Sequence, residues 1–346
     1  MNRWLARIWA EPCGATLLLA PFGRLYGAIT AARMRRPPAG RVGIPVVAVG
    51  NFTVGGAGKT PTVAALVAFA RARGLKPAVV TRGYGGRARG PLQVDPKRHD
   101  AAEVGDEALL HARIAPTIVA RDRLAGAREA ERLGADCVFL DDGFQNPRLA
   151  KDFSLVVVDR ASGLGNGRAM PAGPLRAPLA AQIDRADAIL VVDSGEGTHP
   201  STERTIATAQ VKGIPVLGVR LAPRASAGIE GRRVIAFARI GRPAKFAATL
   251  TAIGAVIADF VAFPDHHPFT AEEATDLLQR AVVADAELVT TAKDAVRLAG
   301  HDGALARLAA SVRVVEIRLV FDEPERLAAL LGPVIGRGSA TAQPRP

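Results

Sequence analysis

The sequence predicts an α/β fold, in which helices cover both faces of a mainly parallel sheet, with a smaller C-terminal α/β subdomain and an N-terminal amphipathic helix. Three observations predict it. Apolar strand-like runs alternate with helical patterns from Ile44 onward. A glycine-rich turn joins the first of these strands to the first helix. A break in composition near Pro223 to Gly231 separates a second alternating set from the first.

Composition limits the classes of protein and partner. The chain has 346 residues and is 49% hydrophobic, enough for two globular domains with full cores. Its net charge of +12 favours an anionic partner, either an anionic lipid or a phosphorylated substrate, unless the arginines only reflect surface composition. Nucleic acid is not expected, because no basic tract is interleaved with aromatic residues. Two cysteines, Cys13 and Cys137, exclude a disulfide framework and fit a reducing cytoplasm.

The first 36 residues form a separate segment, 1–36. Its uncharged run between Glu11 and Arg24 is shorter than the roughly 20 residues that span a bilayer, and it contains Pro21. Tryptophans and arginines at helical spacing indicate an amphipathic helix in a membrane interface; the alternative is a helix packed on the protein body. The apolar positions are Trp4, Leu5, Ile8, Trp9, Leu17, Leu18, Leu19, Phe22, Leu25, Tyr26 and Ile29.

After a linker at 37–40, the first alternating set extends to residue 225. Its apolar runs predict buried parallel strands, with helices between them such as 60–70 and 121–134. The expected strands are 44–50, 77–82, 116–120, 137–142, 153–159, 188–193 and 215–220.

The second set, 226–336, is the predicted C-terminal subdomain, and the Gly, Ser, Pro and Arg tail 337–346 is expected to be disordered. Thr270 and Glu273 have the spacing of a capping box for the helix that begins at residue 271. The expected elements are strands 233–238, 287–291 and 312–320 and helices 243–254, 271–283 and 323–331.

The stretch from Gly50 to Pro61, GNFTVGGAGKTP, has the context of a phosphate-binding loop: strand, glycine-rich turn, Gly-Lys-Thr and helix. Glycines allow backbone N–H groups to surround phosphate oxygens, and the helix N-terminus favours negative charge. Lys59 can reach the β- and γ-phosphates, and Thr60 can hold Mg²⁺. Thr53 stands where the general pattern has glycine. The predicted nucleotide-binding residues are Thr53, Val54, Gly55, Gly56, Ala57, Gly58, Lys59 and Thr60.

Three strands end in aspartate, where the carboxyl ends of parallel strands meet a ligand crevice. Asp141 and Asp142, followed by a glycine, are the preferred candidates for holding magnesium, directly or through water. Asp159 and Asp193 end strands of the same shape, so spacing alone does not choose among them.

Other polar motifs allow two interpretations. Asp106 opens a short helix, where a carboxylate is either a helix cap or a base. Arg82 and Tyr84 could contact a phosphate or a sugar, although their glycine-rich surroundings could merely turn the chain. His266 and His267 point in different directions, so a single one of them could assist proton transfer, and no further ligand at suitable spacing supports a metal. The Lys293–Asp294 pair could equally be a surface salt bridge.

Taken together, these motifs resemble the tetraacyldisaccharide 4′-kinase family of lipid A biosynthesis, in the same order and over most of residues 1 to about 330. Thr53 is tolerated in that family, but Ala177 stands where many members have Glu. The matching segments are Gly50–Pro61, Thr81–Gly86, Gly105–Glu107, Leu140–Gln145, Pro171–Arg176, Asp265–Phe269 and Thr291–Asp294.

The resemblance implies ATP- and Mg²⁺-dependent phosphorylation of the 4′-hydroxyl of a lipid A disaccharide 1-phosphate, giving lipid IVA, by a peripheral enzyme on the cytoplasmic face of the bacterial inner membrane. No obligate protein partner is evident. Family roles imply Lys59 for charge neutralisation and Thr60, Asp141 and Asp142 for the metal. They imply Asp106 paired with His266 as the base, and substrate contacts are assigned to Arg82 and Tyr84.

Two other hypotheses use the same loop. A membrane-associated ATPase switch of the partition type, a deviant P-loop protein, needs lysine at the position of Val54, so this residue counts against it. A nucleotide-responsive adaptor without turnover is the third hypothesis. The fate of the γ-phosphate distinguishes the three.

Overall fold

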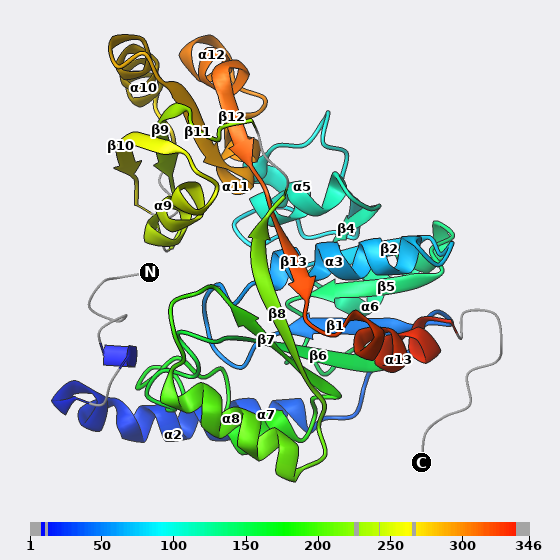
Figure 1. Cartoon of the computed structure of the whole chain (residues 1–346). Helices are drawn as coiled ribbons and strands as arrows, with labels where there is room; N and C mark the ends of the chain where they lie inside the picture. Colours follow the sequence, from blue (N-terminus) through cyan, green and yellow to red (C-terminus); the bar gives the residue numbers. More distant parts are fainter. Residues whose placement is uncertain (1–7, 11–12, 225–227, 242, 265–267, 337–346) are drawn as a thin grey trace.

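The computed structural model describes residues 8–10, 13–224, 228–241, 243–264 and 268–336. In this part of the chain, strands form a nine-stranded and a four-stranded sheet, which lie in two units of unequal size (Figure 1). The predicted α/β fold with a mainly parallel sheet is confirmed.

The large sheet has the strand order β13-β8-β7-β6-β1-β5-β2-β4-β3. Neighbouring strands from β8 to β4 are parallel, and β13 and β3 close the two edges in antiparallel orientation. Its strands are β1 (Val46–Gly50), β2 (Pro77–Thr81), β3 (Leu92–Gln93), β4 (Thr117–Val119), β5 (Cys137–Asp141), β6 (Phe153–Asp159), β7 (Ala188–Asp193), β8 (Val216–Pro223) and β13 (Ile317–Phe321).

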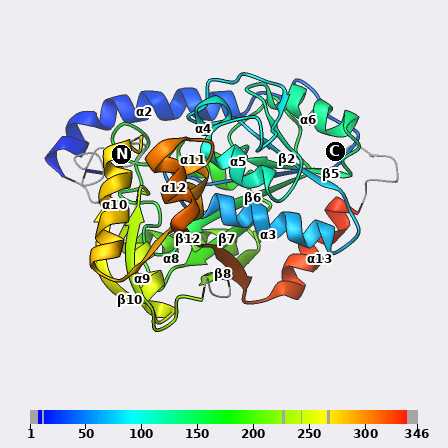
Figure 2. The same cartoon turned by 90° about the horizontal axis from the view of Figure 1, so that it is seen from above.

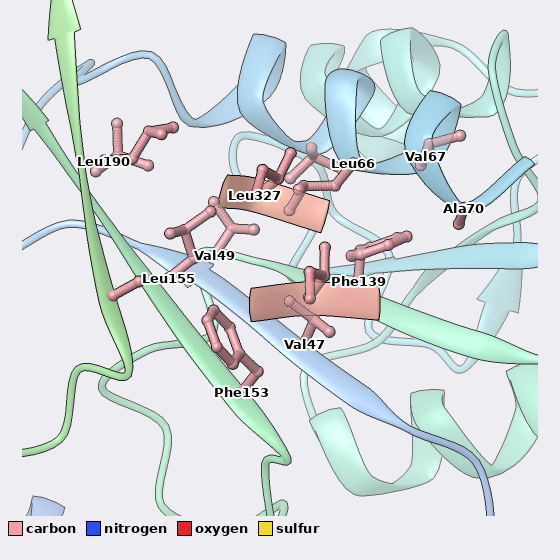
Figure 3. Close-up of a cluster of buried hydrophobic side chains, with 14 of the residues drawn as sticks. Val47, Val49, Leu66, Val67, Ala70, Phe139, Phe153, Leu155, Leu190 and Leu327 are labelled. Carbon is pink, nitrogen blue, oxygen red and sulfur yellow. The ribbon is translucent and has the colours of Figure 1, made fainter. Parts of the chain in front are cut away.

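Helices cover both faces of this sheet. Because side chains alternate along a strand, Val47 and Val49 of β1 pack with Leu66 and Leu327 on one face (Figure 3). Val46 packs on the other face. The helices of this unit are α2 (Gly14–Met34), α3 (Lys59–Arg71), α4 (Ala101–Val104), α5 (Asp106–Ala112), α6 (Arg123–Arg132), α7 (Leu179–Ile183), α8 (Pro200–Val211) and α13 (Pro324–Ile335).

The small sheet is wholly parallel, in the order β10-β9-β11-β12. The predicted capping box is confirmed: the Thr270 hydroxyl accepts from the Glu273 amide, and the Glu273 carboxylate accepts from the Thr270 amide. The elements are β9 (Arg233–Ala238), α9 (Pro243–Ala252), β10 (Val256–Ala262), α10 (Ala271–Val283), β11 (Glu287–Thr291), α11 (Ala292–Leu298), α12 (Gly303–Ser311) and β12 (Val312–Val315).

The end of the chain differs from the prediction. The single strand expected at 312–320 is two strands, because β12 pairs in the small sheet and β13 pairs antiparallel with β8 in the large one. The helix expected at 323–331 extends to Ile335 and packs on the large sheet. The strand β10 was not predicted. We therefore propose 229–315 as the small unit in place of 226–336; it is inserted between two neighbouring strands.

Helix α2 lies along the large unit at the side of α7 and α8 (Figure 1). Within the described residues of the N-terminal segment, Ile8 and Trp9 are buried, and the Trp9 indole donates to the Pro171 carbonyl. These two residues therefore pack on the protein instead of facing outward as the amphipathic prediction required. Trp4 and Leu5 lie outside the described residues.

Helix α2 packs through its small residues. A Cβ at Gly23 would lie 2.7 Å from the Ala169 carbonyl oxygen, and one at Gly27 would lie 3.1 Å from Pro178, so glycine permits the close approach. The opposite face carries large apolar side chains that are 60 to 79% exposed. They are Leu17, Leu18, Phe22, Leu25 and Ile29.

Candidate active site

The predicted phosphate-binding loop connects β1 to α3 at the carboxyl edge of the large sheet. Gly58, the residue that precedes α3 as its N-cap, has φ +93°, a left-handed conformation that disfavours side chains. Positions 55 and 56 face open space, since a Cβ built at either glycine meets no atom within 4 Å. Among the described residues, the backbone amides of 55–60 donate to no protein acceptor. The next residue, Pro61, has no amide hydrogen to donate. The loop therefore presents unpaired donors at a helix N-terminus, which suits an anion.

A second loop, Pro171–Arg176, supports the first. The Val54 amide donates to the Pro174 carbonyl at 2.8 Å, and the Arg176 guanidinium donates to the Thr53 carbonyl at 2.9 Å. The amide of Val54 is thus used within the protein. Ala177 is fully buried, and its carbonyl accepts from the Gln182 amide group.

Lys59 lies over the loop that precedes it. Its Nζ donates to Asn51 Oδ1 and to the Gly55 carbonyl, both at 3.3 Å, and it lies 3.6 Å from Asp142 Oδ1. The side chain is largely buried, so its positive charge acts close to the open part of the loop.

Asp142 follows β5 with φ 54° and carries two cationic neighbours. Arg176 Nη1 donates to Asp142 Oδ2 at 2.8 Å, whereas Oδ1 is buried without a hydrogen bond. Burial alone would raise the pKa of Asp142, but the charges of Lys59 and Arg176 outweigh it and lower that pKa. The group is therefore a carboxylate with one oxygen left to bind a cation.

Asp141, at the end of β5, pairs with a histidine that the sequence did not indicate. His111 Nε2 of α5 lies 3.0 Å from Asp141 Oδ2, and both side chains are almost fully buried. The other carboxylate oxygen, Oδ1, has no hydrogen-bond partner. Asp159 and Asp193, the alternatives, instead contact Lys245 and Arg160.

Asp106 lies at the start of α5 and is nine-tenths buried. Arg297 Nη2 of α11 donates to its Oδ2 at 2.5 Å, while Oδ1 accepts from the Glu107 amide. His266, its predicted partner, lies outside the described residues, so the predicted pairing stays a prediction.

Glu107 joins the phosphate-binding loop to the small unit. Its Oε1 accepts from the Thr60 hydroxyl at 3.4 Å and from Lys293 Nζ at 2.7 Å. Burial would raise its pKa, but Lys293, with Lys59 and His111, lowers the pKa of Glu107 from 4.5 to about 2. Lys293 therefore forms its ion pair with Glu107 at the site, and not with a neighbour on the protein surface.

The Glu107–Lys293 ion pair should make the stability of the fold sensitive to acid. Because the folded pKa lies below the unfolded value, the pair stabilises the fold above pH 4.5, and this stability is lost as pH falls from about 4.5 to about 2. Glu107→Gln should remove roughly 3 kcal/mol of that pH dependence. Urea unfolding between pH 2 and 7 measures it. Glu129→Gln, which breaks an ion pair on α6, is the control and should change little; equal curves for wild type and Glu107→Gln would contradict the assignment.

Arg82 and Tyr84, the predicted substrate contacts, are exposed on the loop after β2. This loop adjoins the start of α5, because a Cβ at Gly105 would lie 2.5 Å from the Tyr84 carbonyl oxygen. The predicted substrate loop and Asp106 are thus neighbours through their backbones.

The donor set fits one kind of metal. The described residues contain no group of three or more His, Cys, Asp or Glu side chains that could enclose an ion. However, Asp141 and Asp142, which lie beside the phosphate-binding loop, each have one buried carboxylate oxygen without a hydrogen bond. Mg²⁺ binds in this way, through one or two carboxylates together with phosphate oxygens and water.

Several residues at this site have no role in the sequence prediction. The matching segments include Glu107, Arg176 and Lys293, but the sequence did not indicate what these side chains do. His111 and Arg297 carried no signal, because their contacts join residues 30 and 191 positions apart.

Comparisons with known proteins agree on one family. The family model described as LpxK, tetraacyldisaccharide-1-P 4′-kinase, matches residues 15–335. A tetraacyldisaccharide 4′-kinase of Methylobacterium radiotolerans is 52% identical over 318 residues, covering 92% of this chain and 94% of the relative. One of Rhodopseudomonas palustris is 50% identical over 316 residues, covering 91% of each. The crystal structure of Aquifex aeolicus LpxK in complex with ATP has a TM-score of 0.71 at 26% identity and covers 93% of this chain and 99% of that one.

Proposed function

The chain belongs to the tetraacyldisaccharide 4′-kinase family, and from this we propose that it transfers the γ-phosphoryl group of ATP to the 4′-hydroxyl of tetraacyldisaccharide 1-phosphate. One observation supports the proposal most directly: an open phosphate-binding loop and four carboxylates lie together at the carboxyl edge of the large sheet. These carboxylates belong to Asp106, Glu107, Asp141 and Asp142.

Phosphate binding is assigned to the loop at 53–60. The free amides of 55–60 surround the β- and γ-phosphates, and Lys59 leaves its weak contacts to neutralise their charge. Arg176 holds Asp142 and the Thr53 carbonyl, which keeps the loop in place. Such fixed donors stabilise the charge that spreads over the transferred group.

Mg²⁺ is assigned to Thr60, Asp141 and Asp142, with Glu107 beside the Thr60 hydroxyl. When bound, the ion neutralises charge on the β- and γ-phosphates. His111 fixes one oxygen of Asp141 and leaves the other for the ion. The protein thereby orients both carboxylates before the nucleotide arrives.

Asp106 is assigned as the base on the 4′-hydroxyl, with His266 as its partner. A positioned base contributes typically 10²–10⁴-fold to rate. The nearby loop of Arg82 and Tyr84 is assigned to the disaccharide. Positioning supplies most of the remaining catalysis, because phosphoryl transfer needs little covalent help from the protein.

One assay tests the function. The whole protein is incubated with γ-labelled ATP, Mg²⁺ and detergent-solubilised lipid A precursor. Label in the lipid is the expected result. Label in free phosphate alone would identify an ATPase switch, and ATP binding without any transfer would identify an adaptor; either outcome overturns the kinase assignment.

Membrane attachment is proposed for α2. By length and composition this helix could cross a membrane, but its Gly23 and Gly27 side packs on the 169–178 loop. The outward apolar face therefore suits insertion into one leaflet, parallel to its surface. Burying this face in lipid brings the site to an acylated substrate that stays in the bilayer.

Positive charge supports the same orientation. The carboxyl end of α2 adjoins a pocket lined by Arg33, Arg36 and Arg148, and Arg24 lies on the helix itself. Each such arginine near an anionic surface contributes about 1 kcal/mol. Because ATP is a cytoplasmic substrate, the proposed location is the cytoplasmic face of the inner membrane.

The exposed face of α2 gives a prediction. Leu18→Glu/Leu25→Glu should weaken cosedimentation with anionic vesicles roughly a hundredfold, because two leucines no longer insert. Val282→Glu/Val283→Glu, at two exposed residues of α10, is the matched control. Equal loss in both variants, or in neither, would show that α2 is not the membrane contact.

A further inference from the structure

Within the described residues, the small unit makes two ionic contacts with the start of α5, and both come from α11. Lys293 and Arg297 lie four residues apart, on one face of that helix, and contact Glu107 and Asp106 respectively. Apolar contact accompanies them, since Val296 packs with Ala108 and other residues of α5. Figure 2 shows α11 beside α5. One helix of the small unit therefore meets both adjacent carboxylates of the large one.

The guanidinium of Arg297 is held on the side of the small unit. Nη1 donates to the Arg239 carbonyl at 2.8 Å and to Asp294 Oδ1 at 3.2 Å. Asp294 is itself fixed, because its other oxygen accepts from the Thr291 hydroxyl and the Arg239 amide. These bonds determine where Nη2 lies.

From Nη2, a bond of 2.5 Å reaches Asp106 Oδ2, and both side chains are nine-tenths buried. A buried charge-assisted hydrogen bond of this kind fixes direction as well as distance. The Asp106 carboxylate cannot rotate without breaking it. The remaining lone pairs of Asp106 are therefore aimed by a residue of the other unit.

We propose that Arg297 is a positioning residue for phosphoryl transfer, which holds the Asp106 carboxylate in the direction required to accept the hydroxyl proton of the sugar. The base is then complete only when α11 lies against α5. Arg297 touches neither substrate and acts through Asp106 alone. The inference rests on the proposed kinase function and adds to it a requirement for the small unit.

Three variants of the full-length protein test the inference in the labelled-phosphate assay. Arg297→Gln should lower kcat roughly 10- to 100-fold, the effect of a misplaced catalytic group. The KM for Mg·ATP should stay within about twofold of wild type, because Lys59 and the loop are unchanged. Arg297→Lys should recover part of kcat, since it keeps the charge but loses the planar fork. Arg280→Gln, which breaks ion pairs with Asp259 and Asp276 in the same unit, should leave kcat unchanged.

A double-mutant cycle separates positioning from a structural role. If Arg297 acts through Asp106, adding Arg297→Gln to Asp106→Asn should lower kcat no further. Equal additional loss would overturn the inference, as would wild-type kcat in Arg297→Gln or a rise in KM for Mg·ATP with kcat unchanged. Should Arg297→Gln fail to fold in a melting experiment, Arg297→Lys replaces it in the cycle with the same criteria. Absence of labelled lipid from wild type would instead refute the kinase function.

Discussion

Lys59→Ala is expected to lower kcat for lipid phosphorylation roughly a thousandfold. The ammonium group lies over the open part of the phosphate-binding loop, and in the described part of the chain no other lysine or arginine side chain donates a hydrogen bond to residues 55–60. Steady-state turnover with saturating Mg·ATP measures the loss. The fold should persist, because the two hydrogen bonds of Lys59 are long and Arg176 still neutralises Asp142.

Lys212→Ala is the matched control for this prediction. Lys212 also pairs with an aspartate, Asp184, but on the exposed surface beyond α8. Its loss should change neither turnover nor melting temperature by a measurable amount. Turnover close to wild type in Lys59→Ala would refute the role assigned to the lysine and, with it, the phosphate-binding assignment of the loop.

Asp106→Ala is expected to reduce kcat by roughly 10²- to 10⁴-fold, the usual contribution of a positioned base. ATP binding should be retained, because Asp106 contacts α5 and Arg297 but not the phosphate-binding loop. Asp106→Asn should give a similar loss in kcat with a smaller effect on stability, since it leaves an amide oxygen to accept from Arg297.

Asp122→Asn controls for a carboxylate that caps a helix. Asp122 accepts from the Leu124 amide at the start of α6, and asparagine caps equally well. Turnover should therefore be unchanged in this variant. If Asp106→Asn behaves like Asp122→Asn, then Asp106 is only a helix residue, and the base must be sought elsewhere at the site.

Local patterns were sufficient to predict most of the large sheet. Apolar runs such as 153–159 and 188–193 form β6 and β7 at the predicted bounds, because a strand buried on both faces needs a continuous apolar sequence. The run at 312–320 predicts one strand, since its composition does not reveal that the chain changes sheets at Glu316. That change depends on a free edge at β8, which only the assembled sheet provides.

The site was predictable where the motif is contiguous. The loop at 53–60 and Asp142 occupy the expected edge because strand order brings β1 and β5 together. The contacts of Glu107 with Lys293 and of Asp106 with Arg297 were not predictable, since they join residues 186 and 191 positions apart. The sequence around a charged residue does not indicate which distant residue it will pair with.

The insertion of the small unit between β8 and β13 has a mechanical consequence. Pro223 pairs with Ile317, and the Arg224 amide donates to the Glu316 carbonyl, so the chain leaves and re-enters the large unit through adjacent strands. Two crossings side by side define a single hinge axis. Rotation about that axis would separate α11 from α5 while β8 and β13 stay fixed, and a cross-link between α11 and α5 would prevent that rotation without touching the phosphate-binding loop.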